Sequence, residues 1–565
     1  MRDSLVRGVA TMILSSIAAC CAAARDLDEA SGAIVFRVIG PESGVDFRYR
    51  DGSRGRRDLP EVMGGGVALI DIDGDGLLDL YFCNGGPIGA EQTGVRDVTP
   101  CRTYRNLGGG RFEDATARTG APGPSYAMGV AVGDYDGDGR DDLFVTGWGG
   151  RKLYRNLGAG RFEDATAHAG VESNLWSTGA AFADLDRDGD LDLFVANYLA
   201  YDAALAPYCA APDGRRDYCG PEDFPAQPDV LYRNNGDGTF TDVARAAGVD
   251  LPDGRGLGVL VADLVGDSAL DLYVANDGTP CRLFENLGGL RFREVAMEAG
   301  VALDANGVAP AGMGVALGDI DGDGRPDLVV TNFYARGTIG FRARGRGVFL
   351  DESAALGISG PTRNATGFGV ALEDFNGDGR LDLIEANGHV VERARLGVPF
   401  AMRSTLLRNE GGRLVDVSKT AGPAFGRAML GRGLAVGDLD DDGKPDVVLA
   451  ALDAPPLLLR NESKSGRWVA VELVPRGGGG VFGARVTARI AGRLILRDRP
   501  GGGSYLSSTS RTVWFGLGAA RGLESLEVAW PSGRVERWEE VPAGIRLIVR
   551  EGEARLETGR ARRSR

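Results

Sequence analysis

The sequence predicts an all-β protein, a seven-bladed β-propeller followed by a small C-terminal β-domain. The main observation is a nonapeptide of the form D-x-D-G-D-G-x-x-D, followed by an apolar residue. It recurs seven times, beginning at Asp71, Asp134, Asp184, Asp263, Asp319, Asp374 and Asp438. Successive copies begin 50 to 79 residues apart, which leaves room for one four-stranded blade per copy. The second observation is that strand-like segments surround every copy.

Short apolar segments flank each copy and predict the strands of a blade. A run such as Gly66–Leu69 precedes the loop, and alternating apolar residues such as Leu143–Val145 follow it. A third strand ends in an Arg-Asn or Glu-Asn pair in six units: Arg105-Asn106, Arg155-Asn156, Arg233-Asn234, Glu285-Asn286, Arg408-Asn409 and Arg460-Asn461. A fourth strand carries an F-x-D pattern, as in Phe112–Asp114. The fifth unit lacks the Asn-containing pair.

The two ends of the repeat array complement each other. The last unit reaches Asn461 without an F-x-D segment after it, whereas Phe36–Val38 and Gly44-Val45 match Phe162–Val171 but precede the first loop. We therefore expect the N-terminal strand to complete the seventh blade, which removes the free sheet edge. An open solenoid would need caps that the sequence does not offer.

The composition fits this fold and excludes several functions. Glycine accounts for 88 of the 565 residues, aromatic residues for 7%, and the formal net charge is −15. Such an acidic chain lacks the basic surface of a nucleic-acid-binding protein. Only two histidines occur, so zinc, haem or Ser-His-Asp chemistry has few possible supports.

The aspartate loops predict calcium sites. Calcium takes six to eight oxygen ligands, so side chains at positions one, three, five and nine, with the backbone carbonyl at position seven, can surround one ion. Six loops have a full set, and the predicted ligands are Asp71, Asp73, Asp75, Leu77 and Asp79; Asp134, Asp136, Asp138, Arg140 and Asp142; Asp184, Asp186, Asp188, Asp190 and Asp192; Asp319, Asp321, Asp323, Arg325 and Asp327; Asp374, Asn376, Asp378, Arg380 and Asp382; and Asp438, Asp440, Asp442, Lys444 and Asp446. We therefore expect about six bound Ca²⁺ ions.

The fourth loop is degenerate, and two other interpretations of the loops were weighed. Val265 replaces the carboxylate at position three and Ser268 replaces the turn glycine, so this site should be weak or absent. An EF-hand is excluded, because Phe82 stands at position twelve of the first loop and the flanks are strands. Plain Asp/Gly turns are the alternative, but seven copies in one register argue against it.

The residues at the N-terminus of the chain predict export. Arg2 and Arg7 precede an apolar stretch from Gly8 to Ala19, which is typical of a signal peptide. The segment Ile17–Cys20 resembles a lipobox, whereas cleavage within Ala22–Ala24 is the alternative. We expect an extracytoplasmic protein, secreted, periplasmic or lipid-anchored at the cell envelope, with membrane attachment only through lipid at Cys20.

The repeats end near Gly466, where a different β-rich segment begins. The predicted division is a signal peptide at 1–30, a propeller at 31–465, a second β-domain at 466–552 and an Arg-rich tail at 553–565. The glycine run 477–480 lacks the Gly-Lys-Ser/Thr that a phosphate-binding loop requires, so a hairpin turn is expected there.

The loops and the C-terminal motifs together resemble a known family. The D-x-D-G-D-G loops with their flanking strands, over Phe36–Asn461, resemble the FG-GAP/VCBS repeats of integrin-α-like propellers. The segments Gly483–Arg485, Gly503–Ser508, Phe515–Gly518 and Val528–Gly533 resemble the ASPIC/UnbV domain. The chain thus resembles the bacterial form of the cartilage acidic protein family. This resemblance implies the fold, export and calcium binding, and it implies no reaction.

Cysteine and histidine leave some alternatives open. Close spacing favours disulfides between Cys209 and Cys219 and between Cys83 and Cys101, while a Cys83–Cys281 pair stays open. His389 could face a ligand at the propeller mouth or be a hydrogen-bonded structural residue, and His168 is expected to be exposed.

Three classes of function remain, of which a binding module is favoured. Its partner would be a protein or a glycan. An enzyme with its active site in the central funnel is the second class, but the sequence has no G-x-S-x-G elbow and no nucleotide-binding loop, so we expect no catalysis. A structural role in the cell envelope is the third.

Overall fold

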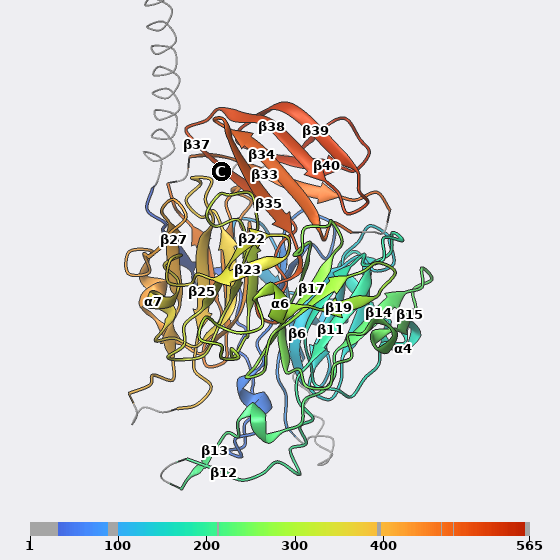
Figure 1. Cartoon of the computed structure of the whole chain (residues 1–565), viewed down its shortest axis with the longest axis vertical. Helices are drawn as coiled ribbons and strands as arrows, with labels where there is room; N and C mark the ends of the chain where they lie inside the picture. The colour runs from blue at the N-terminus through green and yellow to red at the C-terminus, as the bar shows by residue number, and fades with distance from the viewer. Residues whose placement is uncertain are drawn as a thin grey trace, which may run out of the picture.

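The computed structural model describes residues 32–88, 100–211, 214–392, 397–464, 466–477 and 480–559 (Figure 1). The predicted signal peptide, with Cys20, lies outside the described residues. None of the helices within the described ranges is long and apolar enough to cross a membrane.

Seven antiparallel sheets of four propeller strands each form the propeller, as the repeat predicts. Blade 1 consists of β2 (Val67–Ile70), β3 (Asp79–Phe82), β4 (Arg102–Asn106) and β5 (Phe112–Asp114). Blade 2 consists of β6 (Ala127–Gly133), β7 (Asp142–Gly147), β8 (Lys152–Gly158) and β9 (Arg161–Asp164). Blade 3 consists of β10 (Ser177–Ala183), β11 (Asp192–Asn197), β14 (Val230–Asn234) and β15 (Phe240–Asp242).

The remaining blades repeat the same order. Blade 4 consists of β16 (Gly256–Ala262), β17 (Asp271–Asn276), β18 (Arg282–Asn286) and β19 (Phe292–Glu294). Blade 5 consists of β20 (Val315–Gly318), β21 (Asp327–Val330), β22 (Ile339–Gly345) and β23 (Val348–Asp351). Blade 6 consists of β24 (Gly367–Glu373), β25 (Asp382–Asn387), β27 (Thr405–Asn409) and β28 (Leu414–Asp416). Blade 7 consists of β30 (Gly431–Gly437), β31 (Asp446–Ala451), β32 (Leu457–Asn461) and β1 (Phe36–Ile39).

The N-terminal strand closes the ring, which confirms the prediction from the ends of the array. β1 lies antiparallel to β32, with Phe36 opposite Asn461 and Ile39 opposite Leu458. The Phe36 ring is buried against Phe375 of the neighbouring blade, with ring centroids 5.3 Å apart. The two ends of the array are therefore paired within one sheet, so neither end is left as an incomplete blade.

Short helices follow the fourth strands of five blades and turn the chain toward the next blade. They are α3 (Thr116–Thr119), α4 (Thr166–Ala169), α5 (Ala244–Ala247), α6 (Ala296–Ala299) and α7 (Ser359–Thr362). The first four end at a glycine in the left-handed conformation, such as Gly120 with φ +74°. His168 lies in α4 and is exposed, as expected.

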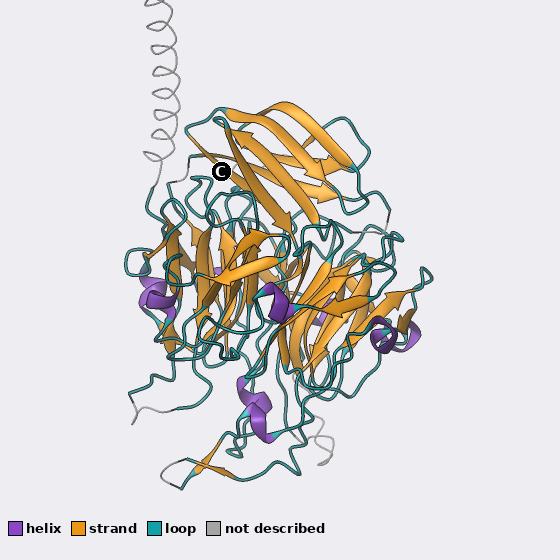
Figure 2. Ribbon diagram, viewed as in Figure 1, coloured by secondary structure: helices purple, strands orange, loops and turns teal. Residues whose placement is uncertain are grey.

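The C-terminal domain is a sandwich of two four-stranded sheets that lies over one face of the propeller (Figure 2). One sheet consists of β37 (Val513–Gly518), β33 (Arg467–Val474), β40 (Ile545–Arg550) and β41 (Glu557–Gly559), with β33 and β40 parallel. The other consists of β35 (Arg493–Arg499), β34 (Ala484–Ile490), β38 (Gly522–Ala529) and β39 (Val535–Pro542). Alternate residues of β34 are buried, as the two-residue period of a half-covered strand requires.

A ten-residue connection of the C-terminal domain, residues 501–510, enters the central channel of the propeller. We call it the channel segment. Its first residues form β36 (Gly501–Gly502), which pairs with the inner strand β16 of blade 4. Further along, Ser504 exchanges two backbone hydrogen bonds with Val315 of blade 5, at 2.6 and 3.0 Å. Backbone bonds to the inner strands of blades 1, 2 and 7 follow at Ser508, Leu506 and Ser510.

The tip of the channel segment packs against residues that close the opposite mouth of the channel. Tyr505 and Leu506 are buried in one apolar cluster with Met63, Tyr198 and Phe368. The Tyr505 hydroxyl donates a hydrogen bond of 2.6 Å to Met63 O, and its ring lies 4.8 Å from that of Phe368. The channel segment therefore lies within the channel, and its tip is buried there.

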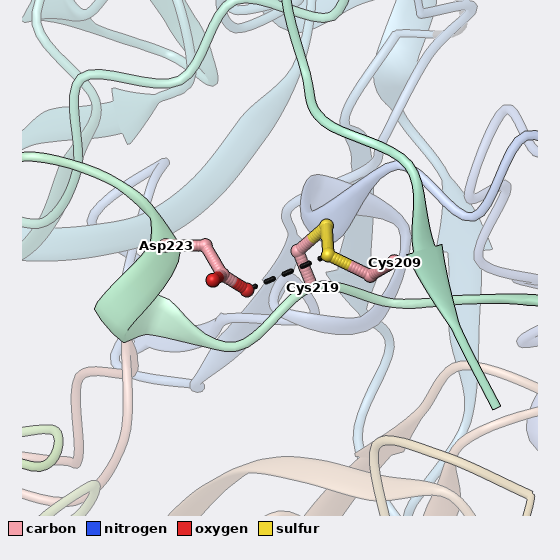
Figure 3. A group of neighbouring side chains, drawn as sticks. All are labelled: Cys209, Cys219 and Asp223. Carbon is pink, nitrogen blue, oxygen red and sulfur yellow. Dashed lines mark hydrogen bonds between the residues drawn. A yellow bond between two sulfur atoms is a disulfide. The ribbon is translucent and has the colours of Figure 1, made fainter. Parts of the chain in front are cut away.

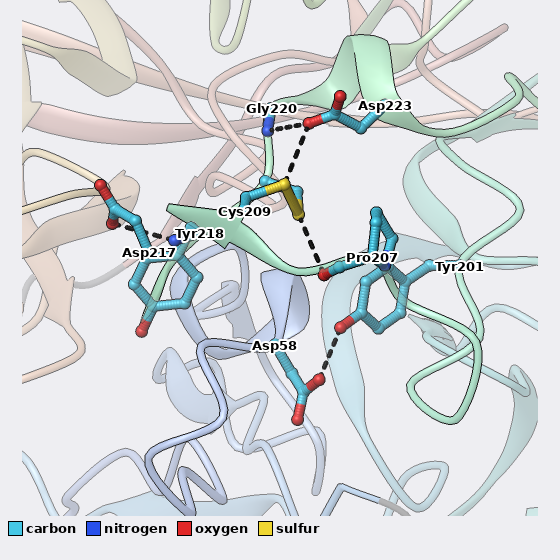
Figure 4. Close-up of a disulfide and its surroundings, with 9 residues drawn as sticks. Asp58, Tyr201, Pro207, Cys209, Asp217, Tyr218, Gly220 and Asp223 are labelled. Carbon is cyan, nitrogen blue, oxygen red and sulfur yellow. Dashed lines mark hydrogen bonds between the residues drawn. A yellow bond between two sulfur atoms is a disulfide. The ribbon is translucent and has the colours of Figure 1, made fainter. Parts of the chain in front are cut away.

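A disulfide-linked insertion projects from the face opposite the C-terminal domain (Figure 1). It carries the hairpin of β12 (Cys209–Ala210) and β13 (Arg216–Asp217), and Cys209 is bonded to Cys219, as the spacing predicts. Figure 4 shows this region, where the Tyr201 hydroxyl donates to Asp58 Oδ1 at 2.7 Å. The expected Cys83–Cys101 disulfide is wrong, as is the alternative Cys83–Cys281 pair. All three thiols are free and buried in blade cores.

Candidate calcium sites

Each aspartate loop joins the first and second strands of its blade by a tight turn. In the first loop, Asp71 Oδ1 accepts hydrogen bonds from the N–H groups of Gly74 and Asp75, at 2.9 and 3.1 Å, and Oδ2 accepts one from Gly76 at 2.9 Å. Gly74 and Gly76 have φ of +76° and +84°, which glycine adopts without steric cost. The position-one carboxylate thus holds the loop backbone in a tight turn through these three hydrogen bonds.

The predicted carboxylate ligands converge in four loops. Ligand atoms of three residues lie within 4.8 Å of one another in each of these sets: Asp71, Asp73 and Asp79; Asp134, Asp136 and Asp142; Asp184, Asp186 and Asp188; and Asp319, Asp321 and Asp323. Calcium binds oxygens at about 2.3–2.6 Å, so oxygens this far apart fit around one ion. At position seven, the Leu77 N–H donates to Asp75 Oδ1 at 3.0 Å, which ends the turn.

Unpartnered buried oxygens test whether these residues fit a metal ion. Asp73 Oδ1 and Asp184 Oδ1 are both buried without a hydrogen-bond partner. A buried carboxylate oxygen without a donor is costly, and a cation with oxygen ligands satisfies it. The donor set and the orphaned atoms therefore fit calcium in these loops.

The aspartate at position nine has a structural role that the sequence pattern does not reveal. Asp79 Oδ2 accepts from Ile72 N at 3.0 Å, and Oδ1 accepts from Asn106 N on the third strand at 2.6 Å. Burial raises the pKa of Asp79 to about 7 and that of the equivalent Asp142 to about 8. The position-nine aspartate therefore ties the loop to the sheet.

The arginine of the Arg-Asn pair contacts the loop carboxylates, which sequence reasoning missed. Arg105 pairs with Asp73 and lies 2.9 Å from Asp75, at positions three and five. Arg155 and Arg460 contact the position-three carboxylates of their own loops in the same way, and so does Arg342 in the fifth unit, where Ala343 follows in place of asparagine. In the fourth unit, Glu285 replaces this arginine and Val265 replaces the carboxylate, so the two changes match. The joint loss of the arginine and the carboxylate in one unit could have revealed the contact from the sequence alone.

The asparagine of the same pair links neighbouring blades. Asn106 Nδ2 donates to Leu78 O in its own loop at 2.9 Å and to Leu439 O in the seventh loop at 3.0 Å. Equivalent double bonds are made by Asn156, Asn234, Asn286, Asn409 and Asn461. We call these six residues the inter-blade asparagines. Blade 5 has Ala343 at this place, whose N–H still donates to Asp327 Oδ1.

The fourth loop keeps the turn without the ligand set. Asp263 accepts hydrogen bonds from the N–H groups of Gly266 and Ser268, at 2.7 and 3.1 Å, as Asp71 does in the first loop. Ser268 has a φ of +75°, so a non-glycine residue adopts the strained conformation here. The turn thus forms even where the set of ligand residues is incomplete.

The C-terminal domain covers the sixth and seventh loops. Gly516 N donates to Asp374 Oδ2 at 3.2 Å, and Asn376 and Asp378 are buried. Gly322 and Asp323 of the fifth loop are exposed instead. The first and second loops face a cavity of about 490 Å³ beneath the C-terminal domain, whose lining includes Arg499 and Arg511. The loops thus differ in their access to solvent.

Two other groups of polar side chains have structural roles. His389 is buried, its Nδ1 lies 2.9 Å from Thr366 Oγ1, and its ring contacts Phe333, which supports the hydrogen-bonded structural interpretation. Cys209, Cys219 and Asp223 lie close enough to hold a metal ion (Figure 3). Both sulfur atoms are consumed by the disulfide, so they offer no thiolate ligands.

The fold and the loops define the class of this protein as an FG-GAP-repeat propeller. Segments 71–145, 134–195, 212–274, 263–330 and 319–385 match the FG-GAP-like repeat, and residues 479–556 match the ASPIC and UnbV domain. The chain belongs to the family of FG-GAP-repeat proteins with a C-terminal ASPIC/UnbV domain, to which the cartilage acidic proteins also belong.

Curated relatives support the same assignment. Cartilage acidic protein 1 of Mus musculus is 30% identical over 353 residues, which is 58% of this chain and 50% of that protein. The Homo sapiens protein is 30% identical over 54% of this chain and 45% of its own length. The chain therefore spans about half the length of the curated relatives it matches.

Solved structures align with low similarity. A lectin of Agrocybe aegerita that recognises non-reducing terminal N-acetylglucosamine is 19% identical, with a TM-score of 0.36 over 69% of this chain and 86% of that one. BBS1N in complex with ARL6DN, soaked with lead, is 10% identical, with a TM-score of 0.39 over 77% and 98%.

Proposed function

We propose that the chain is an exported, calcium-binding module that binds a protein or glycan partner. The convergence of oxygen ligands in the loops is the observation that carries the calcium assignment. Bound calcium would neutralise carboxylates that the fold holds close together and would cross-link each loop. In this assignment Asp71, Asp73, Asp75 and Asp79 hold the first ion, and equivalent residues hold the others.

A filled channel supports binding rather than catalysis. Propeller enzymes of the kind considered above need an open funnel, and here Tyr505 and Leu506 are buried in the place where a substrate would enter. Contacts with a partner would therefore be made by outer surfaces: the exposed loops, the blade rims and the projecting insertion. Calcium would act on them by ordering the loops.

A capture experiment tests the binding function. The full chain, immobilised with calcium, should retain a stoichiometric partner from an envelope extract or from a glycan array, and chelation should release it. Asp321→Ala, in an exposed and complete loop, is the calcium-site variant, and Asp267→Ala, in the degenerate loop, is its matched control. Retention of nothing, together with turnover of a glycan or ester panel, would refute the binding module and favour an enzyme.

Export is proposed on separate grounds. The Cys209–Cys219 disulfide supports an oxidising compartment. Fusion of residues 1–30 to a reporter should carry it out of the cytoplasm, and Cys20→Ser should convert a membrane-associated product into a soluble one. A reporter that stays in the cytoplasm would refute export, whereas membrane association that persists in the Cys20 variant would refute only the lipid anchor.

A further inference from the structure

The seventh loop differs from the others by an additional carboxylate in an unusual place. Position four of each loop has a left-handed backbone, with φ between +61° and +82°, and five loops place glycine there. The seventh loop places Asp441 there, with φ +61°. A side chain in this conformation costs free energy relative to glycine, so a compensating contact is expected.

The compensating contact comes from the C-terminal domain. Arg546, on β40, lies with Nη1 3.4 Å from Asp441 Oδ1 and with Nη2 3.2 Å from Asp438 Oδ2. Asp438 is the position-one carboxylate, and its side chain is 1% exposed. The guanidinium therefore bridges positions one and four of the loop. A planar guanidinium with several donors is suited to such paired carboxylates.

Other cations contact the carboxylates at positions three and five of this loop. Arg460 Nη2 lies 2.6 Å from Asp440 Oδ2 and 3.7 Å from Asp442 Oδ2, and Lys444 Nζ lies 3.6 Å from Asp442 Oδ2. Arg460 has counterparts in other blades, whereas Arg546 reaches the loop from a different domain. In the first loop, position one accepts only backbone N–H bonds among those described, from Gly74, Asp75 and Gly76.

We propose that Arg546 is the resident cation of the seventh loop, which docks the C-terminal domain in place of binding calcium. The inference rests on the proposed calcium sites and separates the seventh loop from the other complete loops. Five complete loops bind an ion, whereas in the seventh the guanidinium and calcium compete for Asp438. Asp440 Oδ1 is buried without a hydrogen-bond partner. Removal of Arg546 would also release Asp438 Oδ2, so both oxygens could then receive an ion.

Calcium stoichiometry of the full chain tests this competition. Metal-free protein is dialysed against saturating calcium, and bound ions per chain are counted for the wild type and variants. Asp440→Ala should leave the number unchanged, because the loop holds no ion. Arg546→Gln should gain one ion, and the double variant Arg546→Gln/Asp440→Ala should lose that gain. Arg550→Gln, on the same strand and paired with Glu557, is the matched control and should change nothing.

The outcomes separate this inference from the proposed function. Loss of one ion in Asp440→Ala, or no gain in a folded Arg546→Gln variant, overturns the role of Arg546 and leaves the other calcium sites standing. If Arg546→Gln does not fold, Asp440→Ala decides alone, since it retains the arginine. A wild-type chain that binds no calcium refutes the calcium sites and the competition together.

Discussion

Asn156 of blade 2 and Ile72 of blade 1 are joined by a hydrogen bond of 3.3 Å from Asn156 Nδ2 to Ile72 O, across the boundary between the blades. The same amide donates to Asp141 O at 2.9 Å. Asn156→Ala would leave one buried and one half-buried carbonyl group without this donor, so we expect the free energy of unfolding to fall by about 1–3 kcal/mol. Urea denaturation measures the loss. Asn235→Ala, at an exposed turn, is the control and should change it by less than about 0.5 kcal/mol.

Blade 5 offers the reverse experiment, because it lacks the inter-blade asparagine. Ala343 has the same backbone contact to Asp327 Oδ1 as the asparagines have to their aspartates. Ala343→Asn should therefore supply the missing link between blades 4 and 5 and stabilise the protein by about 0.5–1.5 kcal/mol. A lower denaturation midpoint in this variant would show that the site cannot accept the amide.

The channel segment should contribute strongly to stability. Tyr505→Phe removes only the hydrogen bond to Met63 O, at an expected cost of about 1 kcal/mol. Tyr505→Ala also leaves a cavity where the ring packs, which should lower the free energy of unfolding by about 3–5 kcal/mol. Thermal unfolding of the two variants separates these contributions. Equal melting temperatures for Tyr505→Ala and the wild type would contradict the burial of this ring.

Calcium should stabilise the propeller by linkage. One site with calcium at about 100 times its dissociation constant adds about 2.7 kcal/mol, so several sites together should raise the melting temperature sharply. Chelation should reverse this, and magnesium should restore it poorly because it demands a small octahedral shell. Asp321→Ala should lose one bound ion and Asp267→Ala none. Melting curves that do not respond to chelator would mean that the loops are turns only.

Stability should also depend on pH through Glu385, which is not a loop residue. It is buried on β25, Thr338 donates to its Oε2, and burial raises its pKa to about 7. The folded state therefore binds the proton more tightly than the unfolded state, and stability falls as pH rises from about 4.5 to 7. In Glu385→Gln, the decrease in unfolding free energy between pH 5 and pH 8 should be smaller than in the wild type by about 3 kcal/mol. An unchanged pH profile in the variant would show that the carboxyl is not the source.

Much of the propeller could be predicted from the repeat, but the channel segment could not. Periodic apolar residues and turn glycines report local strands, and the unmatched ends at Phe36 and Asn461 were enough to predict closure. Residues 501–510 have no such periodicity, and their strand-like bonds arise only from contact with the inner strands of the blades. The contacts of Arg105 and Arg546 were missed for a different reason, because these long side chains meet partners that are distant in sequence.

The channel segment also has a consequence for the order in which the protein folds. Tyr505 and Met63 are 442 positions apart in the chain, and Val35 and Ser463, which join the ends of the ring, are 428 apart. Contacts of such high contact order form slowly, since a long loop must close before they contribute any free energy. A chain emerging from the ribosome can assemble individual blades, but the seventh blade stays incomplete until Asn461 has appeared, and the channel until Tyr505 has.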